Sequence, residues 1–220
     1  SPFGIQWNVF HKTQLDSYTG TTITEDRLRE ALGMPLKSIK GLKILEAGSG
    51  AGRFTEILLK YGAVVYSFDV SNAVEANALN NKNINLTIFQ ASIAAIPFEE
   101  NFFDAAVCLG VMQHTENSKE SILEISRVVK KNGLIAFDHY KKHLGHFFSM
   151  YLIYWFIIKN LPIRYQLKIT NTLTRIFFPL HWYFRKYNLI QFLLRRISPI
   201  SFYYGMFPLS NFGCELRRAR

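Results

Sequence analysis

Short apolar runs alternate with longer segments of helical periodicity through the first two thirds of the chain. The runs are rich in Val, Ile, Leu and Phe, and the segments between them place apolar residues three or four positions apart. Strands separated by helices of this length predict a parallel sheet with right-handed crossovers. The pattern therefore predicts an α/β fold with flanking helices, and its five expected strands span 43–48, 63–70, 84–92, 103–111 and 134–140.

Two of the expected helices carry signals at their ends. The segment 118–133 has Ile122 and Ile125 on one apolar side, and Gly133 is expected to end the helix. Before the first strand, Thr24 is expected to be the N-cap of another helix, with acidic residues in its first turn. These signals place one helix before the first strand and one directly before the fifth.

The first expected strand runs into a glycine-rich turn and then into a helix. Gly48, Gly50 and Gly52 are separated by single residues, and Arg53 opens the helical segment. Glycine permits a tight turn and lets a ligand approach the backbone closely. The start of a helix leaves backbone N–H groups free to face a ligand. This arrangement predicts a nucleotide-type site at the end of the first strand.

Two acidic residues narrow the choice of ligand. Glu46 lies just before the turn, and Asp69 ends the second strand, where a carboxylate can accept hydrogen bonds from both hydroxyls of a ribose. A phosphate is not favoured beside Glu46, whereas a positively charged ligand is tolerated. A nicotinamide-dependent dehydrogenase is a poorer alternative, because its fingerprint places the third glycine one residue later than Gly52.

These features resemble the class I S-adenosylmethionine-dependent methyltransferases, of the type that acts on small molecules in bacteria. Residues 46–54 look like the family's first motif, 68–71 like its second-strand acid, and 90–115 like the segment through its third and fourth strands. Residues 124–137 resemble its last helix, turn and fifth strand. The resemblance covers residues 40–140 and implies a Rossmann-like parallel sheet with S-adenosyl-L-methionine as the cofactor.

The resemblance also implies roles around that cofactor. The three glycines of the turn line its methionine part, Glu46 lies near the ammonium end, and Asp69 binds the ribose. Ser92 stands where the family usually has an Asp that bonds the adenine amino group, and Ile93 beside it flanks the ring. The change from Asp to Ser weakens the case for the adenine contact, although a hydroxyl can still make one.

The residues after the fourth strand are expected to meet the reacting groups. By the resemblance, Leu109 and Gly110 bring backbone near the sulfonium. Gln113 and His114 follow at the carboxyl edge of the sheet, where ligands bind in such folds. His114 is the candidate catalytic base for a hydroxyl acceptor, because histidine commonly takes protons near neutral pH. A positioning or helix-capping role for His114 is an equal alternative.

Other residues are candidates for substrate contacts beside Gln113. His139 and Tyr140 end the fifth strand at the same edge of the sheet. Trp7 lies before the first strand and is expected to close over the cofactor, with a role in the core as the alternative. The two cysteines and the six histidines show no metal-ligand spacing, so no metal is expected.

Charge divides the chain into dissimilar parts. Residues 1–140 hold 13 Lys and Arg and 15 Asp and Glu, a net of −2, whereas residues 141–220 hold 13 Lys and Arg and one acid, a net of +12. We expect an N-terminal helical cap over 1–36, a Rossmann-like methyltransferase core over 37–143, and a basic, aromatic, mostly helical segment over 144–220.

The basic segment indicates an anionic partner, and the alternative is an ordinary helical subdomain with a packed aromatic interior. Its cations are interleaved with Phe, Tyr, Leu and Ile, which favours a membrane surface or a greasy substrate over nucleic acid. The apolar run 147–158 is too short to span a bilayer, which takes about 20 residues. We therefore expect peripheral membrane contact through residues 144–207, and we expect Pro162 and Pro179 to divide this segment into separate helices.

The expected function is transfer of a methyl group to a small-molecule or lipid-like acceptor. The alternative is a non-catalytic, methyltransferase-like protein that binds a membrane or a partner through its basic half. Two cysteines without a disulfide pattern favour a reducing, cytoplasmic compartment, next to the inner face of the membrane. Two further strands usually complete this fold, but no strand pair is evident after residue 140. We expect either that these strands are missing or that the basic segment over 144–220 is an insertion or lid.

Overall fold

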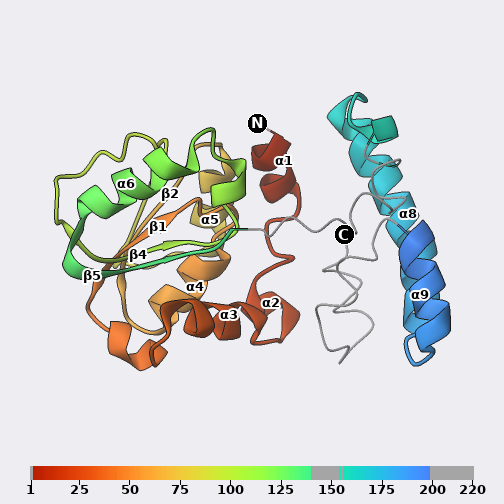
Figure 1. The fold of residues 1–220 in the computed structure, drawn as a ribbon, viewed down its shortest axis with the longest axis horizontal. Coiled ribbons are helices and arrows are strands. Elements are labelled where there is room, and N and C mark those ends of the chain that lie inside the picture. Colours follow the sequence, from red (N-terminus) through yellow and green to blue (C-terminus); the bar gives the residue numbers. More distant parts are fainter. Residues whose placement is uncertain (1, 140–153, 155, 199–220) are drawn as a thin grey trace. The chain divides into compact units, whose positions relative to one another are not determined.

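The computed structural model describes residues 2–139, 154 and 156–198. The chain divides into two compact units, residues 1–140 and residues 141–220. The first unit is a parallel sheet with helices on both faces, and the described part of the second unit is helical (Figure 1). The predicted α/β class and the helical C-terminal segment are both confirmed.

A five-stranded sheet with the order β3-β2-β1-β4-β5 forms the centre of the first unit. Every neighbouring pair is parallel, which confirms the predicted Rossmann-like arrangement. The chain moves outward from β1 to β2 and β3, then crosses to β4 and β5 on the other side. The order therefore reverses between β1 and β4, the point where open α/β sheets bind ligands. The strands are β1 (Lys43–Ala47), β2 (Val64–Asp69), β3 (Leu86–Gln90), β4 (Phe103–Cys108) and β5 (Val129–Phe137).

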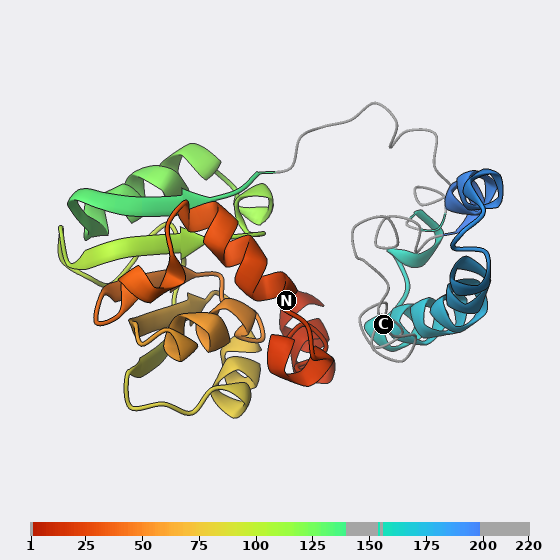
Figure 2. The same ribbon diagram turned by 90° about the horizontal axis from the view of Figure 1, so that it is seen from below.

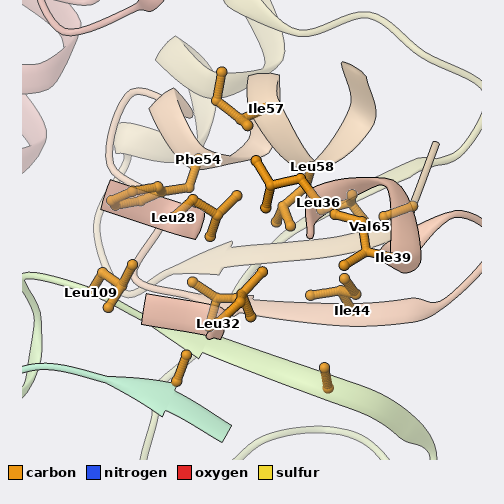
Figure 3. Packing of buried hydrophobic residues seen from close by; sticks show 14 residues of the cluster. Leu28, Leu32, Leu36, Ile39, Ile44, Phe54, Ile57, Leu58, Val65 and Leu109 are labelled. Carbon is orange, nitrogen blue, oxygen red and sulfur yellow. The ribbon is translucent and has the colours of Figure 1, made fainter. Parts of the chain in front are cut away.

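One face of the sheet is covered by α3 (Ile23–Leu32), α4 (Arg53–Lys60) and α5 (Ala73–Asn80) (Figure 2). Helix α4 buries Ile57 and Leu58 against the strands because these residues lie on its apolar side. Figure 3 shows the resulting core. Its members come from helices α3 and α4 and from the strands β1, β2, β4 and β5, and they include Leu28, Leu32, Ile44, Phe54, Val65 and Leu109.

The other face is covered by α6 (Ser118–Val128) and by the loop that leads from β3 to β4. Helix α6 buries Ile125 and Val128. Asn117 caps the helix, since its side chain accepts hydrogen bonds from the backbone of Lys119 and Glu120. Aromatic rings pack edge to face beside α6, with centroids 4.9–5.6 Å apart for Tyr66, Phe98, Phe102 and Phe103.

The boundary between α6 and β5 differs from the prediction. The helix ends at Val128, and Gly133 lies inside β5 instead of ending the helix. The register of β5 against β4 shifts between Phe103 and Ala105, and Asn132 adopts a left-handed backbone (φ 65°). Residues that look like the end of a helix in sequence therefore form an irregular start of the strand.

The segment before the sheet contains α1 (Pro2–Val9), α2 (Asp16–Thr19) and the short 3-10 turn η1 (Leu36–Ile39). The prediction that Thr24 caps α3 is wrong, because Thr24 lies inside that helix. Asp16 performs the capping from eight residues upstream. Its carboxylate accepts hydrogen bonds from the N–H groups of Thr24 (3.1 Å) and Glu25 (2.9 Å).

The described part of the second unit includes the helices α8 (Ile163–Tyr183) and α9 (Asn188–Ile197). Pro162 precedes α8 as predicted, but Pro179 lies within the helix and does not end it. A proline near the end of a helix removes one backbone hydrogen bond without stopping the turns that follow. No helix in the described part of the chain combines the length and apolar character needed to cross a membrane.

Candidate functional site

The turn between β1 and α4 lies at the point where the strand order reverses. Gly48, Gly50 and Gly52 all have left-handed backbones, with φ of 78°, 52° and 84°. The N–H groups of Gly48 and Ser49 donate to the carbonyl of Phe68 on β2 at 2.8 and 2.9 Å. Three left-handed residues in one turn explain why glycine recurs at every second position.

Side chains from other elements lie directly against these glycines. A Cβ at Gly48 would overlap the side chain of Val111, which follows β4, and one at Gly52 would overlap Asn77 of α5. A Cβ at Gly50 would come within 3.2 Å of the indole nitrogen of Trp7. Trp7 therefore packs against the glycine turn, and its role over a cofactor stays a prediction.

Asp69 joins the end of β2 to the glycine turn. Its Oδ2 accepts a hydrogen bond from the N–H of Gly50 (3.0 Å), and its Oδ1 accepts from the N–H (2.9 Å) and hydroxyl (2.7 Å) of Ser71. A carboxylate offers about four acceptor positions. Asp69 therefore fixes the turn and still has capacity for a further donor.

Glu46 is buried beneath the turn, on the face of the sheet covered by α4 and α5. Its Oε2 accepts hydrogen bonds from the hydroxyls of Thr55 and Ser67, the latter at 2.8 Å. Its Oε1 has no partner among the described residues. Burial raises the pKa of Glu46 to about 7, and the hydrogen bonds from Thr55 and Ser67 oppose that rise. Its predicted role near an ammonium group stays a prediction.

Two asparagines of the α5 region extend this buried network to the glycine turn. The amide of Asn77 donates to Thr55 and to Ser67, both at 3.0 Å. The amide of Asn81 donates to the carbonyl of Gly52 (3.0 Å) and to Asn77 (2.8 Å). The shape of the turn therefore depends on side chains that a motif search along β1 does not reveal.

On the β3 side, Ser92 and Ile93 follow the end of that strand. Gln90 pairs with Asp69 across the two strands, so Ser92 and Ile93 continue along the same edge of the sheet. Ser92 is exposed, and its hydroxyl accepts a hydrogen bond from the N–H of Ala94 (3.2 Å). Ile93 packs against the core that α6 covers. Both positions are compatible with the predicted adenine contacts.

On the β4 side, the structure reveals two residues that the motifs did not indicate. Asp138, directly after β5, accepts a hydrogen bond from the N–H of Gly110 (2.6 Å) and forms an ion pair with Arg27 of α3. Leu109 beside them is buried. Asp138 could have been found from the sequence, because it is an acidic residue directly after the predicted fifth strand. Arg27 could not, because its partner lies 111 positions away.

The remaining predicted residues lie after β4 and β5. Gln113 and His114 belong to a short 3-10 turn, η2 (Met112–His114). Both polar atoms of the Gln113 side chain are buried without a described partner, which marks it as available to a ligand. His114 and His139 are exposed. Tyr140 lies outside the described residues.

The N-terminal segment is tied to the same edge of the first unit. Asn8 donates to the carbonyl of Asn72 (3.1 Å), before α5, and His11 shares a hydrogen bond with Asn80 (2.9 Å). Asn80 also donates to the carbonyl of Ala51 in the glycine turn (2.8 Å). The segment therefore covers the turn through specific contacts.

Comparisons with known proteins agree with this geometry. Residues 45–137 match the model of a methyltransferase domain family. The chain is 25% identical over 104 residues to a ubiquinone biosynthesis O-methyltransferase of Coxiella burnetii, covering 46% of this chain and 44% of the relative. It is also 25% identical over 118 residues to a demethylmenaquinone methyltransferase of Tropheryma whipplei, covering 52% and 49%. The chain thus spans about half the length of these relatives.

Solved structures give a weaker likeness. An S-adenosylmethionine-dependent methyltransferase from Mesorhizobium loti has a TM-score of 0.46 at 20% identity, over 51% of each chain. The YcgJ protein of a Bacillus species has a TM-score of 0.47 at 21% identity, over 59% of this chain and 58% of that one.

Proposed function

We propose that the chain, whose residues 45–137 match a methyltransferase domain family, transfers a methyl group from S-adenosylmethionine to a small-molecule or lipid-like acceptor. The observation that carries this proposal is the left-handed glycine turn at the strand-order reversal, held by Asp69 through the N–H of Gly50. When bound, S-adenosylmethionine supplies a methyl group on a positively charged sulfur.

The residues around the turn fit this cofactor. Asp69 has acceptor capacity left for a ribose hydroxyl, and the buried Ser49 hydroxyl in the turn has no described partner. The three glycines present backbone without Cβ atoms to the methionine part. Ser92 and Ile93 hold the adenine end in this proposal, and Glu46 lies beneath the turn.

The acceptor side of the proposal rests on the β4 and β5 loops. Gln113 offers a buried amide that can orient an acceptor, and His114 takes the proton of a hydroxyl acceptor. Trp7 and the cap exclude water above the turn, while His139 and Tyr140 contact the acceptor. Alignment of two reactants and exclusion of water suffice for a reaction of this kind.

The names of the relatives refer to ubiquinone and menaquinone, which are lipid-soluble quinones. We infer that the acceptor of this chain is likewise a lipid-like molecule. An acceptor dissolved in a bilayer requires the enzyme to reach the membrane surface. Peripheral contact through residues 144–207, at the inner face of a cytoplasmic membrane, meets that requirement and is part of the proposal.

A transfer assay tests the function. The chain is incubated with S-adenosylmethionine carrying a labelled methyl group and with a bacterial lipid extract, and labelled products are separated. We expect incorporation that Asp69→Ala abolishes and that His114→Ala reduces by about 100-fold if the acceptor is a hydroxyl. Asp104→Ala is the control, because Asp104 contacts Lys43 and Lys130 at the other end of the strands.

Three results separate the alternatives. Full turnover by His114→Ala overturns the base role alone. Incorporation that survives Asp69→Ala overturns the assigned cofactor site. A chain that binds S-adenosylhomocysteine but labels nothing in the extract supports the non-catalytic alternative.

A further inference from the structure

Helix α9 turns its apolar side chains outward. Leu189, Phe192, Leu193 and Ile197 are 74%, 53%, 56% and 51% exposed. Their spacing of three, four and eight positions from Leu189 places them on one face of the helix. Large apolar side chains gathered on one exposed face indicate an interaction surface. We call these four residues the α9 apolar face.

The fully buried residue of α9 is polar and hydrogen-bonded, and Leu194 on the same side of the helix is half-buried. Gln191 is 6% exposed and bonds to His181 of α8 twice, through the imidazole (3.0 Å) and through the backbone carbonyl (2.9 Å). Ser198, just beyond the helix, is also buried. The packing of α9 on α8 therefore does not use the α9 apolar face, which inverts the usual pattern of a surface helix.

Positive charge surrounds the α9 apolar face. Residues 156–198 contain eight Lys and Arg and no Asp or Glu. Arg185 and Lys186 are exposed just before α9. Arg196 lies over the ring of Phe192, with its guanidinium carbon 4.4 Å from the ring centroid, so a cation adjoins the apolar side chains directly.

We propose that α9 lies in the interface of an anionic lipid bilayer, with the α9 apolar face among the acyl chains and Arg185, Lys186 and Arg196 at the headgroups. Long basic side chains on such a helix keep their charge at the headgroup level while their stems contact lipid. A second copy of this chain is disfavoured as the occupant, because two purely cationic helix pairs repel each other. The inference rests on the proposed function, because it names the part of residues 144–207 that makes the proposed membrane contact.

Vesicle cosedimentation with the full chain tests this proposal. Vesicles of phosphatidylcholine alone are compared with vesicles that also contain phosphatidylglycerol. We expect binding to the anionic vesicles and much weaker binding to the neutral ones, with added salt reducing the former. The double variant Leu189→Asn, Leu193→Asn should lower binding by about tenfold or more, because both side chains lose their apolar contact with lipid.

The matched control is Ile84→Asn, since Ile84 is 99% exposed in the first unit and far from α9 in sequence. We expect Ile84→Asn to bind vesicles as the unaltered chain does. Circular dichroism of both variants should match the unaltered chain, because all three replaced side chains are exposed.

Several results would overturn the proposal. They are an absence of binding to anionic vesicles, equal binding to neutral ones, or unchanged binding by the double variant. Dimerisation in the absence of lipid that the double variant abolishes would assign the α9 apolar face to a second copy. Titration with S-adenosylhomocysteine on the same samples keeps the two proposals apart: retained cofactor binding with lost vesicle binding overturns only the membrane site, and the reverse overturns only methyl transfer.

Discussion

The buried carboxyl of Glu46 makes the stability of the first unit depend on pH. Its pKa rises from 4.5 to about 7 because the folded protein removes the group from water. Each pKa unit is worth about 1.4 kcal/mol, so the folded state gains about 3 kcal/mol when Glu46 is protonated in both states. That stabilisation is complete below pH 4.5, is lost as the pH rises towards 7, and is absent above it.

Glu46→Gln removes this titration while keeping the shape of the side chain. The amide oxygen of glutamine can accept the hydrogen bonds from Thr55 and Ser67. Its amide nitrogen takes the place of Oε1, which has no described partner, and costs about 1–3 kcal/mol at any pH. The substitution therefore shifts stability by a constant and abolishes the part that depends on Glu46.

Urea unfolding followed by circular dichroism, at about pH 5 and about pH 8, measures the difference. We expect the free energy of unfolding of Glu46→Gln, relative to the unaltered chain, to rise by about 2.5 kcal/mol between these conditions. Other titrating groups contribute equally to both proteins and cancel. If the relative stability of the two proteins stays the same at both pH values, Glu46 does not titrate in this range and the burial argument fails.

Two further predictions concern the turn and its neighbours. Gly52→Ala should lower the free energy of unfolding by about 3 kcal/mol or more, because its Cβ would overlap Asn77 and the backbone there is left-handed. The control is Gly20→Ala, which has the same backbone region but open space around its Cβ, and it should cost about 1 kcal/mol. Chemical denaturation measures both. Equal costs for the two would contradict the packing described at the turn. Asp138→Asn should change the free energy of unfolding by less than about 1 kcal/mol, because the ion pair of Asp138 with Arg27 is partly exposed. It should weaken S-adenosylhomocysteine binding about threefold to tenfold, because it weakens the hydrogen bond that holds the N–H of Gly110. Unchanged binding would place Gly110 outside the cofactor site.

Local patterns predicted the sheet and the glycine turn because both depend on residues close together in sequence. The apolar runs identify the strands, and glycine at positions 48, 50 and 52 permits the left-handed backbone that the turn adopts. The start of α3 was mispredicted because its capping group is the Asp16 carboxylate, eight residues upstream of Thr24.

The rest of the site depends on contacts between distant segments. Asn77 supports Thr55 across 22 positions, and Asp138 reaches Gly110 across 28. No periodicity or spacing rule predicts such pairs. The sequence also did not predict that α9 exposes its apolar face. A helix of Leu, Phe and Arg does not reveal that Gln191 is its buried residue.

Calorimetric titration of the intact chain with S-adenosylhomocysteine is the decisive experiment for the cofactor site, because it needs no knowledge of the acceptor. We expect saturable binding that Asp69→Ala and Gly50→Val weaken by at least about tenfold, with Asp104→Ala binding as the unaltered chain does. No heat of binding from the intact, folded chain, or equal binding by Asp69→Ala, would refute the assignment of the glycine turn to S-adenosylmethionine.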